Sequence, residues 1–195
     1  MKTRSRRLDA PRLKPLDEAA WDDEIRPRLE AGRAANDGRV LNIFSTLARH
    51  PKLLKRWLVF GSHVLAKSTL PARERELAIL RIGWLCQAEY EWGQHVVIGR
   101  RSGLSDEEIE RVTEGAEARG WTPLEAAVLR AVDELHEDAM IADPTWQVLS
   151  EHWDERQCID LIFAVGQYNL VSMALNSLGV CRDPGVPGFP EQAGT

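Results

Sequence analysis

Three residues, Glu76, Glu91 and His95, have the types and spacing of a proton-transfer site. Glu91 and His95 are four positions apart in a segment with a helical pattern, so their side chains share one face and can meet. A carboxylate beside an imidazole raises the pKa of the imidazole and fixes its tautomer, as proton transfer near neutral pH requires. If Glu76 reaches the same place, two acids and one base converge, which suits moving protons on and off a carbon next to a carbonyl. From spacing alone, an exposed pair worth about a few tenths of a kcal/mol is the alternative.

Two predicted helices must position these residues. Apolar residues at i, i+3 and i+7 predict a helix that carries Glu76 and ends near Cys86. A second helix is predicted from near Ala88 toward Gly103, which has the place of the glycine that commonly follows a helix C-terminus. Only a short break is expected between the two helices.

Further helices are indicated by their start signals. Ser105 with Glu108, and Thr122 with Glu125, have the spacing of capping boxes, and Asp143 before a proline predicts a third N-cap.

A long helix is predicted from near Asp154 to Gly179, and it is apolar nearly all round, so we expect it in the centre of the fold. No alternating pattern is long enough to predict a strand. The expected class is therefore all-α, a compact helical bundle. We expect a single domain over 1–195 with a core of about 40–180 and flexible arms at 1–15 and 183–195.

Composition and charge exclude several classes of protein. The chain has 44% hydrophobic and 28% charged residues, which is typical of a globular protein. Lys and Arg number 25 against 30 Asp and Glu, for a net charge of −5, so nucleic acid is not an expected partner. No apolar run approaches the ~20 residues that span a bilayer, and Met1–Lys14 is polar without an apolar stretch after it. We therefore expect no membrane partner, no signal peptide and a cytoplasmic location.

The cysteines Cys86, Cys158 and Cys181 are odd in number and have no CxxC spacing, which argues against a disulfide framework and a zinc site. We expect each of them to be a small buried hydrophobe. A metal site would need further ligands beside Glu91 and His95, and no His-x-x-x-His motif or cysteine cluster supplies them.

The segment from Arg73 to Arg101, with the residues that follow it, resembles the carboxymuconolactone decarboxylase and alkylhydroperoxidase D superfamily. The redox members of that superfamily carry Glu, eleven residues, Cys, two residues, Cys, three residues and His. In this register the Glu falls on Glu76 and the His on His95, while the two cysteine positions fall on Ala88 and Glu91. Both thiols are therefore absent, and Cys86, two residues before the first position, does not restore a dithiol.

The decarboxylase branch has the form Glu-aromatic-x-x-His, and the segment Glu91-Trp92-Gly93-Gln94-His95 is similar to it. The resemblance implies an all-α fold, a homotrimer or homohexamer, and no organic cofactor or metal. It implies a cofactor-independent lyase or isomerase that acts on a small carboxylated lactone or keto acid. The chain is longer on both sides of this core than the small decarboxylases are, which leaves the substrate open.

In that chemistry, loss of CO₂ leaves an extended enolate that must be protonated on carbon. We expect His95 to donate that proton, Glu91 to orient His95 and set its charge, and Glu76 to share the proton or fix the substrate. Trp92, beside Glu91, is the expected wall of an apolar pocket.

Other candidate pocket residues lie outside the segment 91–95. Tyr168 and Asn169 lie on the apolar last helix, where Asn169 shares one stripe with Ser172 and Asn176 and either binds neighbouring helix ends or lines the pocket. His63 falls in an apolar helix and could approach the site. Arg81 is a candidate for binding the substrate carboxylate, as is Arg73, unless each pairs with neighbouring acids.

Two other functions are compatible with the sequence. An alkylhydroperoxidase-like antioxidant enzyme would need a thiolate next to His95, where the chain has Glu91. A non-catalytic oligomeric small-molecule binder would keep the fold and have no turnover. Seven tryptophans and strongly apolar helices favour a homo-oligomer in either case.

Overall fold

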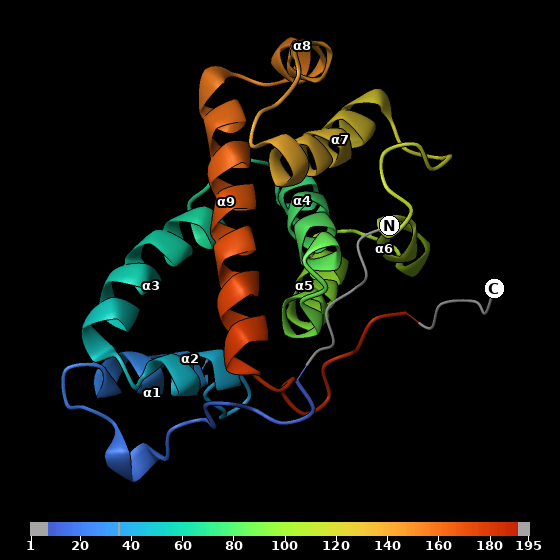
Figure 1. Ribbon diagram of the computed structural model, residues 1–195. Coiled ribbons are helices and arrows are strands. Elements are labelled where there is room, and N and C mark those ends of the chain that lie inside the picture. The colour runs from blue at the N-terminus through green and yellow to red at the C-terminus, as the bar shows by residue number, and fades with distance from the viewer. Residues whose placement is uncertain (1–7, 35, 191–195) are drawn as a thin grey trace.

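The computed structural model describes residues 8–34 and 36–190, and every regular element in these ranges is helical (Figure 1). The predicted all-α class is therefore confirmed. A 3₁₀ turn, η1, precedes the α-helices. The bounds are η1 (Glu18–Ala20), α1 (Arg26–Ala34), α2 (Asn42–Leu47), α3 (Pro51–Ala66), α4 (Ala72–Leu85), α5 (Glu89–Arg101), α6 (Asp106–Arg111), α7 (Pro123–Asp138), α8 (Asp143–His152) and α9 (Glu155–Leu178).

Helix α4 lies at the centre of the fold, packed between α5, α7 and α9. Its residues from Glu76 to Gly83 are all buried. Because a helix in this position has no solvent face, it must be apolar or have paired charges on every side. The two buried charged residues of α4, Glu76 and Arg81, are both paired.

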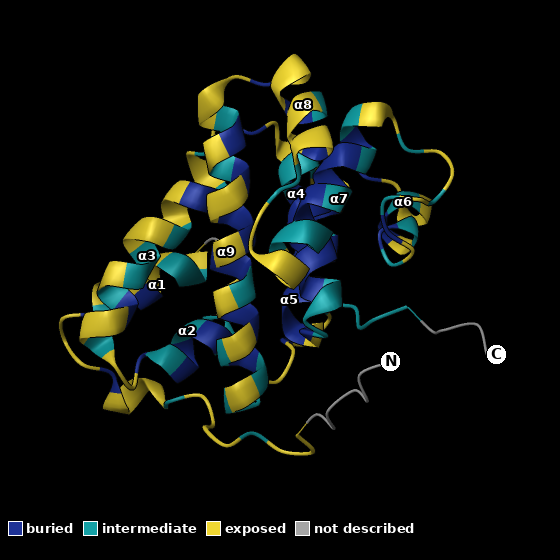
Figure 2. Ribbon diagram, turned by 45° about the horizontal axis from the view of Figure 1, so that its top comes forward, coloured by how far each residue is buried: buried dark blue, intermediate teal, exposed yellow. Residues whose placement is uncertain are grey.

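Contrary to the expectation from sequence, helix α9 is long and apolar enough to cross a membrane by length and composition, although half of its apolar window is buried in the fold. A core helix passes the same test. The predicted central position is correct for one face only, because Ile159, Phe163, Leu170 and Met173 are more than half exposed. Figure 2 shows this exposed face as a row of yellow segments along α9.

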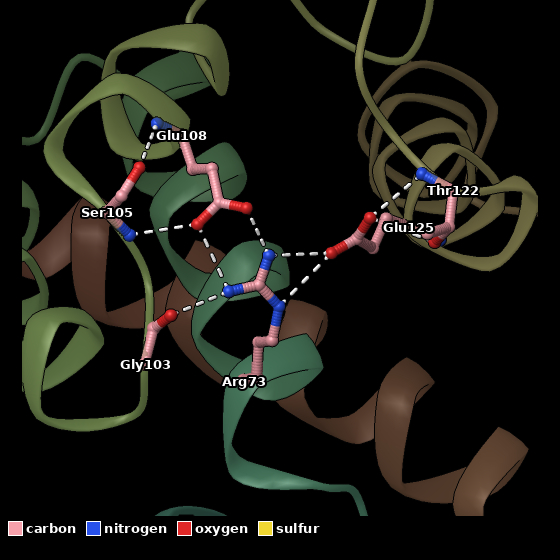
Figure 3. Close-up of polar contacts among 6 residues, drawn as sticks. All are labelled: Arg73, Gly103, Ser105, Glu108, Thr122 and Glu125. Atoms are coloured by element: carbon pink, nitrogen blue, oxygen red, sulfur yellow. Dashed lines mark hydrogen bonds and ion pairs between the residues drawn. The ribbon is translucent and has the colours of Figure 1, made fainter.

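The two predicted capping boxes are present, and one arginine connects them (Figure 3). The backbone N–H of Ser105 donates to Glu108 (2.8 Å), and that of Thr122 donates to Glu125 (2.9 Å). Arg73, in the first turn of α4, donates to both glutamates. The starts of α6 and α7 are thereby fixed to the start of α4.

Other helix ends were predicted with mixed success. Asp154 caps α9 through a box with Gln157, and Gly179 ends it in the left-handed conformation, as expected. Gly103 follows α5 with a positive φ of 92°. The predicted N-cap Asp143 is wrong, because α8 begins at that residue and its N-cap is Ala142, which makes no side-chain cap.

The core extends further toward the N-terminus than the predicted 40–180. Trp21, Ile25 and Leu29 form a second apolar cluster with Ala48 and Leu54. Through this cluster η1 and α1 pack against α3, and α3 contributes one wall of the pocket described below.

Residues 183–190, here called the C-terminal segment, were predicted to be a flexible arm, and this prediction is wrong. Phe189 packs against Trp84 and Trp92, with ring centroids at 5.2 and 5.7 Å. Gly93 has no Cβ where the Pro187 carbonyl crosses α5, and any side chain there would overlap it. The rest of the predicted arms at 1–7 and 191–195 lies outside the described residues, while Arg12 of the N-terminal arm donates its backbone N–H to the Leu178 carbonyl (2.9 Å).

Candidate active site

The turn between α4 and α5 brings the predicted trio together. Helix α4 ends at Leu85, Gln87 has a left-handed φ of 51°, and α5 begins at Glu89, so the two helices pack against each other. Glu76 of α4 thereby faces His95 of α5.

His95 lies between two carboxylates. Its Nδ1 is 2.6 Å from Glu76 Oε2, and its Nε2 is 3.0 Å from Glu91 Oε1. The side chains of the three residues are at most 6% exposed. Arg75 donates its Nε–H to the other oxygen of Glu76 (3.1 Å), so positive and negative groups alternate along this chain of contacts. The alternative of an exposed helix pair is therefore wrong.

The charge of His95 follows from these contacts. Burial favours the neutral imidazole, but Glu76 and Glu91 together outweigh burial and raise the pKa of His95 to about 9. This is higher than the near-neutral value expected from sequence, because there are two carboxylates and not one. At neutral pH both ring nitrogens carry protons and donate them to the flanking carboxylates.

A pocket of about 170 Å³ opens beside Glu91 and His95. Within the described part of the chain, these two are the charged residues of the lining, and no lysine or arginine reaches it. Its walls come from α2 with the residue before it, α3, α5 and α9. The lining residues are Leu41, Ile43, Phe44, Trp57, Leu58, Gly61, Ser62, Leu65, Tyr90, Glu91, Gln94, His95, Ile98, Gln167, Tyr168 and Val171.

Tyr168 lines this pocket, as predicted. Its ring meets the His95 imidazole edge-on, with centroids 4.8 Å apart and an interplanar angle of 83°. Burial, followed by the charges of Glu91 and Glu76, raises the pKa of the Tyr168 phenol well above its ordinary value. Tyr168 therefore stays protonated and can only act as a neutral hydrogen-bonding group.

Two other predicted pocket residues do not line this pocket. Trp92 is fully buried on another side of α5 against Trp84, with ring centroids 5.6 Å apart. Asn169 accepts a hydrogen bond from Cys86 Sγ (3.0 Å), and Asn176 donates to the Cys86 carbonyl (2.9 Å). The two asparagines of the α9 stripe thus bind the end of α4, as the structural interpretation predicts, whereas Ser172 Oγ is buried without a hydrogen-bond partner among the described residues.

His63 and Arg81 are also outside the pocket. The His63 side chain is 56% exposed and lies 4.0 Å from Asp160. Arg81 is buried but donates to both oxygens of Asp133 (2.6 and 3.1 Å) and to the Val112 carbonyl (2.9 Å). Arg81 cannot also bind a substrate, so the prediction that it holds a carboxylate is wrong.

The cysteines differ in their surroundings. Cys158 is buried, as predicted, while Cys86 is half-buried and Cys181 is exposed, so the prediction is wrong for Cys181. None of the three lines the pocket.

Several lining residues were not singled out from sequence. Tyr90 and Gln94 directly precede Glu91 and His95 and repeat their i, i+4 spacing, and this pattern could have indicated them. Gln167 precedes Tyr168 as a polar residue in an apolar helix, a second usable indication.

Asp183 was assigned to a flexible arm, yet it holds two pocket walls. It is 9% exposed and accepts hydrogen bonds from Tyr90 Oη (2.6 Å), Gln94 Nε2 (2.8 Å) and the backbone N–H of Asn42 (2.9 Å). Burial and the Asp183 carboxylate raise the pKa of Tyr90, so this phenol stays a donor. One carboxylate of the C-terminal segment therefore fixes α5 and the start of α2.

Within the described residues, no group of three or more His, Cys, Asp and Glu side chains is arranged to hold a metal ion.

Residues 51–134, which contain α4, α5 and the trio, match the family model described as the carboxymuconolactone decarboxylase family. This part of the chain is therefore similar to that family. No curated protein is significantly similar to it in sequence.

Solved structures with the same fold extend over nearly the whole chain. A peroxidase-related protein with an alkylhydroperoxidase AhpD core from Ralstonia eutropha JMP134 has a TM-score of 0.80 at 20% identity, covering 89% of this chain and 93% of that one. A peroxidase-related protein from Silicibacter sp. TM1040 has a TM-score of 0.76 at 16% identity, covering 97% and 99%. The debrominase Bmp8, solved in complex with 2,3,4-tribromopyrrole, has a TM-score of 0.73 at 13% identity, covering 92% and 95%. At these identities the matches establish the fold.

Proposed function

We propose that the protein is a cofactor-independent lyase or isomerase of the carboxymuconolactone decarboxylase type. In this proposal Glu91, His95 and Glu76 move a proton at a carbon next to a carbonyl. One observation carries the proposal: a buried imidazole between two buried carboxylates borders a small pocket. A surface ion pair or a core histidine needs neither the second carboxylate nor the pocket.

The contacts assign a role to each residue. Both nitrogens of His95 are paired with carboxylates, so His95 has no free nitrogen to act as the base. Of the two carboxylates, that of Glu91 also lines the pocket, and we therefore assign Glu91 as the base. Glu91 takes a proton from the substrate carbon, the electron pair of the broken C–H bond moves into the carbonyl, and the protonated Glu91 returns the proton to another carbon. His95, kept charged by Glu76, stabilises the negative charge that develops nearby.

The pocket favours an isomerisation over a decarboxylation. A substrate carboxylate would meet no lysine or arginine in the described lining, and it would lie near Glu91. An uncharged lactone or ketone has neither difficulty. The debrominase of the same fold, solved with a small halogenated ring, supports a compact ring as the ligand.

An alkylhydroperoxidase-like activity has less support. The two thiol positions of the redox members are occupied by Ala88 and Glu91, and Cys86 is hydrogen-bonded to Asn169 outside the pocket lining.

The test is proton exchange in D₂O, followed by NMR with a panel of small cyclic ketones and lactones. The proposal expects deuterium to enter next to the carbonyl, with the exchange abolished in Glu91→Gln. Exchange that continues undiminished in Glu91→Gln and His95→Gln would place the chemistry elsewhere. Release of CO₂ from a carboxylated lactone would instead favour the decarboxylase reaction.

We further propose that the protein is a homotrimer or homohexamer in which the exposed apolar face of α9 packs against another copy. Isolated domains rarely expose a continuous apolar row such as Ile159, Phe163, Leu170 and Met173. Light scattering should return a multiple of 22.0 kDa. Leu170→Glu should lower the mass, and Ser150→Glu, at an exposed polar position of α8, should not. A mass of one chain for the unmodified protein refutes the proposal.

A further inference from the structure

Gly61 of α3 leaves a gap in the pocket wall that is bordered by the Gln167 carboxamide nitrogen and by the edge of the Trp57 ring. A Cβ at this position would lie 3.6 Å from Gln167 Nε2 and 3.8 Å from Trp57 Cε2, the ring carbon bonded to the indole nitrogen. The indole and the carboxamide therefore face the same small space from α3 and α9. All three residues line the pocket that also contains Glu91 and His95.

The indole nitrogen of Trp57 is buried and has no hydrogen-bond partner within the described ranges. An indole N–H can only donate, and buried donors without an acceptor are rare because they lose their hydrogen bonds to water. The Trp57 ring packs against Phe44, with centroids 6.1 Å apart, which holds its orientation. A fixed, unsatisfied donor in a pocket wall indicates that a ligand supplies the acceptor.

We propose that the Trp57 indole N–H and the Gln167 carboxamide N–H bind the carbonyl oxygen of the substrate in the gap over Gly61. This inference rests on the proposed function and defines its ligand class: a small, uncharged cyclic ketone or lactone. Two neutral donors suit a carbonyl oxygen, and the described lining has no cation for an anionic group. The pocket volume of about 170 Å³ suits one six-membered ring, since cavities of about 150 Å³ bind benzene.

The donor pair complements the acid–base pair in the same pocket. When Glu91 removes the proton next to the carbonyl, the C–H electron pair shifts and the carbonyl oxygen becomes an enolate oxygen. In this proposal the two donors bind the oxygen before the proton is removed, so they stabilise the charge without rearranging. Return of the proton from Glu91 to carbon restores the carbonyl, so atoms and charge balance.

The first experiment observes the indole N–H directly. Protein labelled with [¹⁵N]tryptophan is titrated with cyclohexanone and with methylenecyclohexane, which has the same shape but no oxygen. The Trp57 indole signal, assigned by its loss in Trp57→Phe, should move downfield with cyclohexanone and not with the hydrocarbon. Trp57→Phe should weaken cyclohexanone binding about tenfold, while Trp146→Phe, at an exposed position of α8, should leave it unchanged.

The second experiment fills the gap. A methyl group on residue 61 meets its neighbours at ordinary contact distance, so Gly61→Ala should fold and, within a helix, should raise the melting temperature. It should nevertheless weaken cyclohexanone binding about tenfold, because the methyl group would overlap an oxygen placed within hydrogen-bonding distance of Gln167 Nε2. Gly32→Ala in α1, where a Cβ also has nothing within 4 Å, should give the helix effect without loss of affinity.

The outcomes separate this inference from the proposed function. If cyclohexanone does not bind, or binds without moving the Trp57 signal, or loses no affinity in either pocket variant, the donor pair is wrong. If cyclohexanone moves the Trp57 signal but no ring proton exchanges in D₂O, the proposed function fails and the donor pair stands. Glu91→Gln should keep ketone binding and lose exchange.

Discussion

Two clusters that each include a residue of α4 have the same arrangement, a cation between two glutamates, but differ in what they can do. Arg73 and the Glu76–His95 pair lie one turn apart, and in each cluster a cation lies between two glutamates (Figure 3 for Arg73). The Arg73 cluster is partly exposed, and its two glutamates also cap α6 and α7. The His95 cluster is buried and borders a pocket.

The two clusters differ in whether their cation can lose a proton. Arg73 is permanently charged and holds the pKa of Glu108 below its ordinary value, so no proton moves there near neutral pH. His95 has a pKa of about 9 and can lose a proton within an accessible range. Charge pairing alone therefore does not identify an active site. The proposal for His95 rests on burial, a titratable cation and an adjoining pocket together.

The largest expected effect is on activity. Glu91→Gln and His95→Gln should each lower the rate of proton exchange by ~10²- to 10⁴-fold, because each removes a partner in proton transfer. The double variant should lose little more than either single one, since the two act as a unit. Glu125→Gln, which changes a glutamate of the other cluster, should keep the full rate. Rates are compared at matched folded fractions, determined by circular dichroism.

The next effect is on the pH dependence of stability. The pKa of His95 rises from 6.5 to about 9 on folding, so its stabilisation is complete below about pH 6.5 and is lost as the pH rises to about 9. The free energy of unfolding should fall by roughly 3 kcal/mol over this window. Urea unfolding from pH 6 to 9.5 measures this decrease. His95→Gln should make the free energy of unfolding nearly independent of pH in this window, and Glu91→Gln should move the upper end of the window below pH 9. An equally steep decrease in His95→Gln contradicts the assignment.

A smaller effect is expected from Arg73→Met. Two helix-capping glutamates would lose their shared cation, which should lower the free energy of unfolding by about 1–2 kcal/mol and leave the activity intact. Arg100→Met breaks a solvent-exposed pair with Asp106 and should change stability by less than about 0.5 kcal/mol. Thermal unfolding of the two variants and the unmodified protein measures both changes in stability. A large loss of activity in Arg73→Met would mean that the two clusters are coupled.

The smallest effect is expected from the cysteines, which lie outside both clusters. Replacing Cys86 and Cys181 by Ser and Cys158 by Ala should leave the exchange rate unchanged, because no thiol lines the pocket. The same triple variant tests the antioxidant alternative. A peroxide-consuming activity that disappears with the cysteines would support that alternative.

The parts of the fold that depend on local sequence were predictable. Capping boxes and a C-terminal glycine act within a few residues, so Ser105, Thr122, Asp154 and Gly179 were placed correctly. The trio was predictable because Glu91 and His95 share a helix face and the family register supplied Glu76.

The partners of the remaining candidates depend on long-range packing. Arg81 pairs with Asp133, 52 residues away, and nothing near Arg81 in the sequence indicates this acceptor. Trp92 follows Glu91 in sequence, but successive helix residues point in different directions, so it packs on the core. Asp183 lies in a segment rich in proline and glycine, a composition that says nothing of its three hydrogen bonds.

The hydrogen bonds of Asp183 also indicate when the pocket walls can form during synthesis of the chain. Its bonds to Gln94 and Asn42 join residues 89 and 141 positions apart, whereas the contacts of His95 with Glu91 and Glu76 span 4 and 19. Chains fold progressively as they are synthesised, and contacts distant in sequence close last. All three members of the trio are therefore synthesised by residue 95, but the walls of its pocket cannot be fixed until residue 183 has left the ribosome.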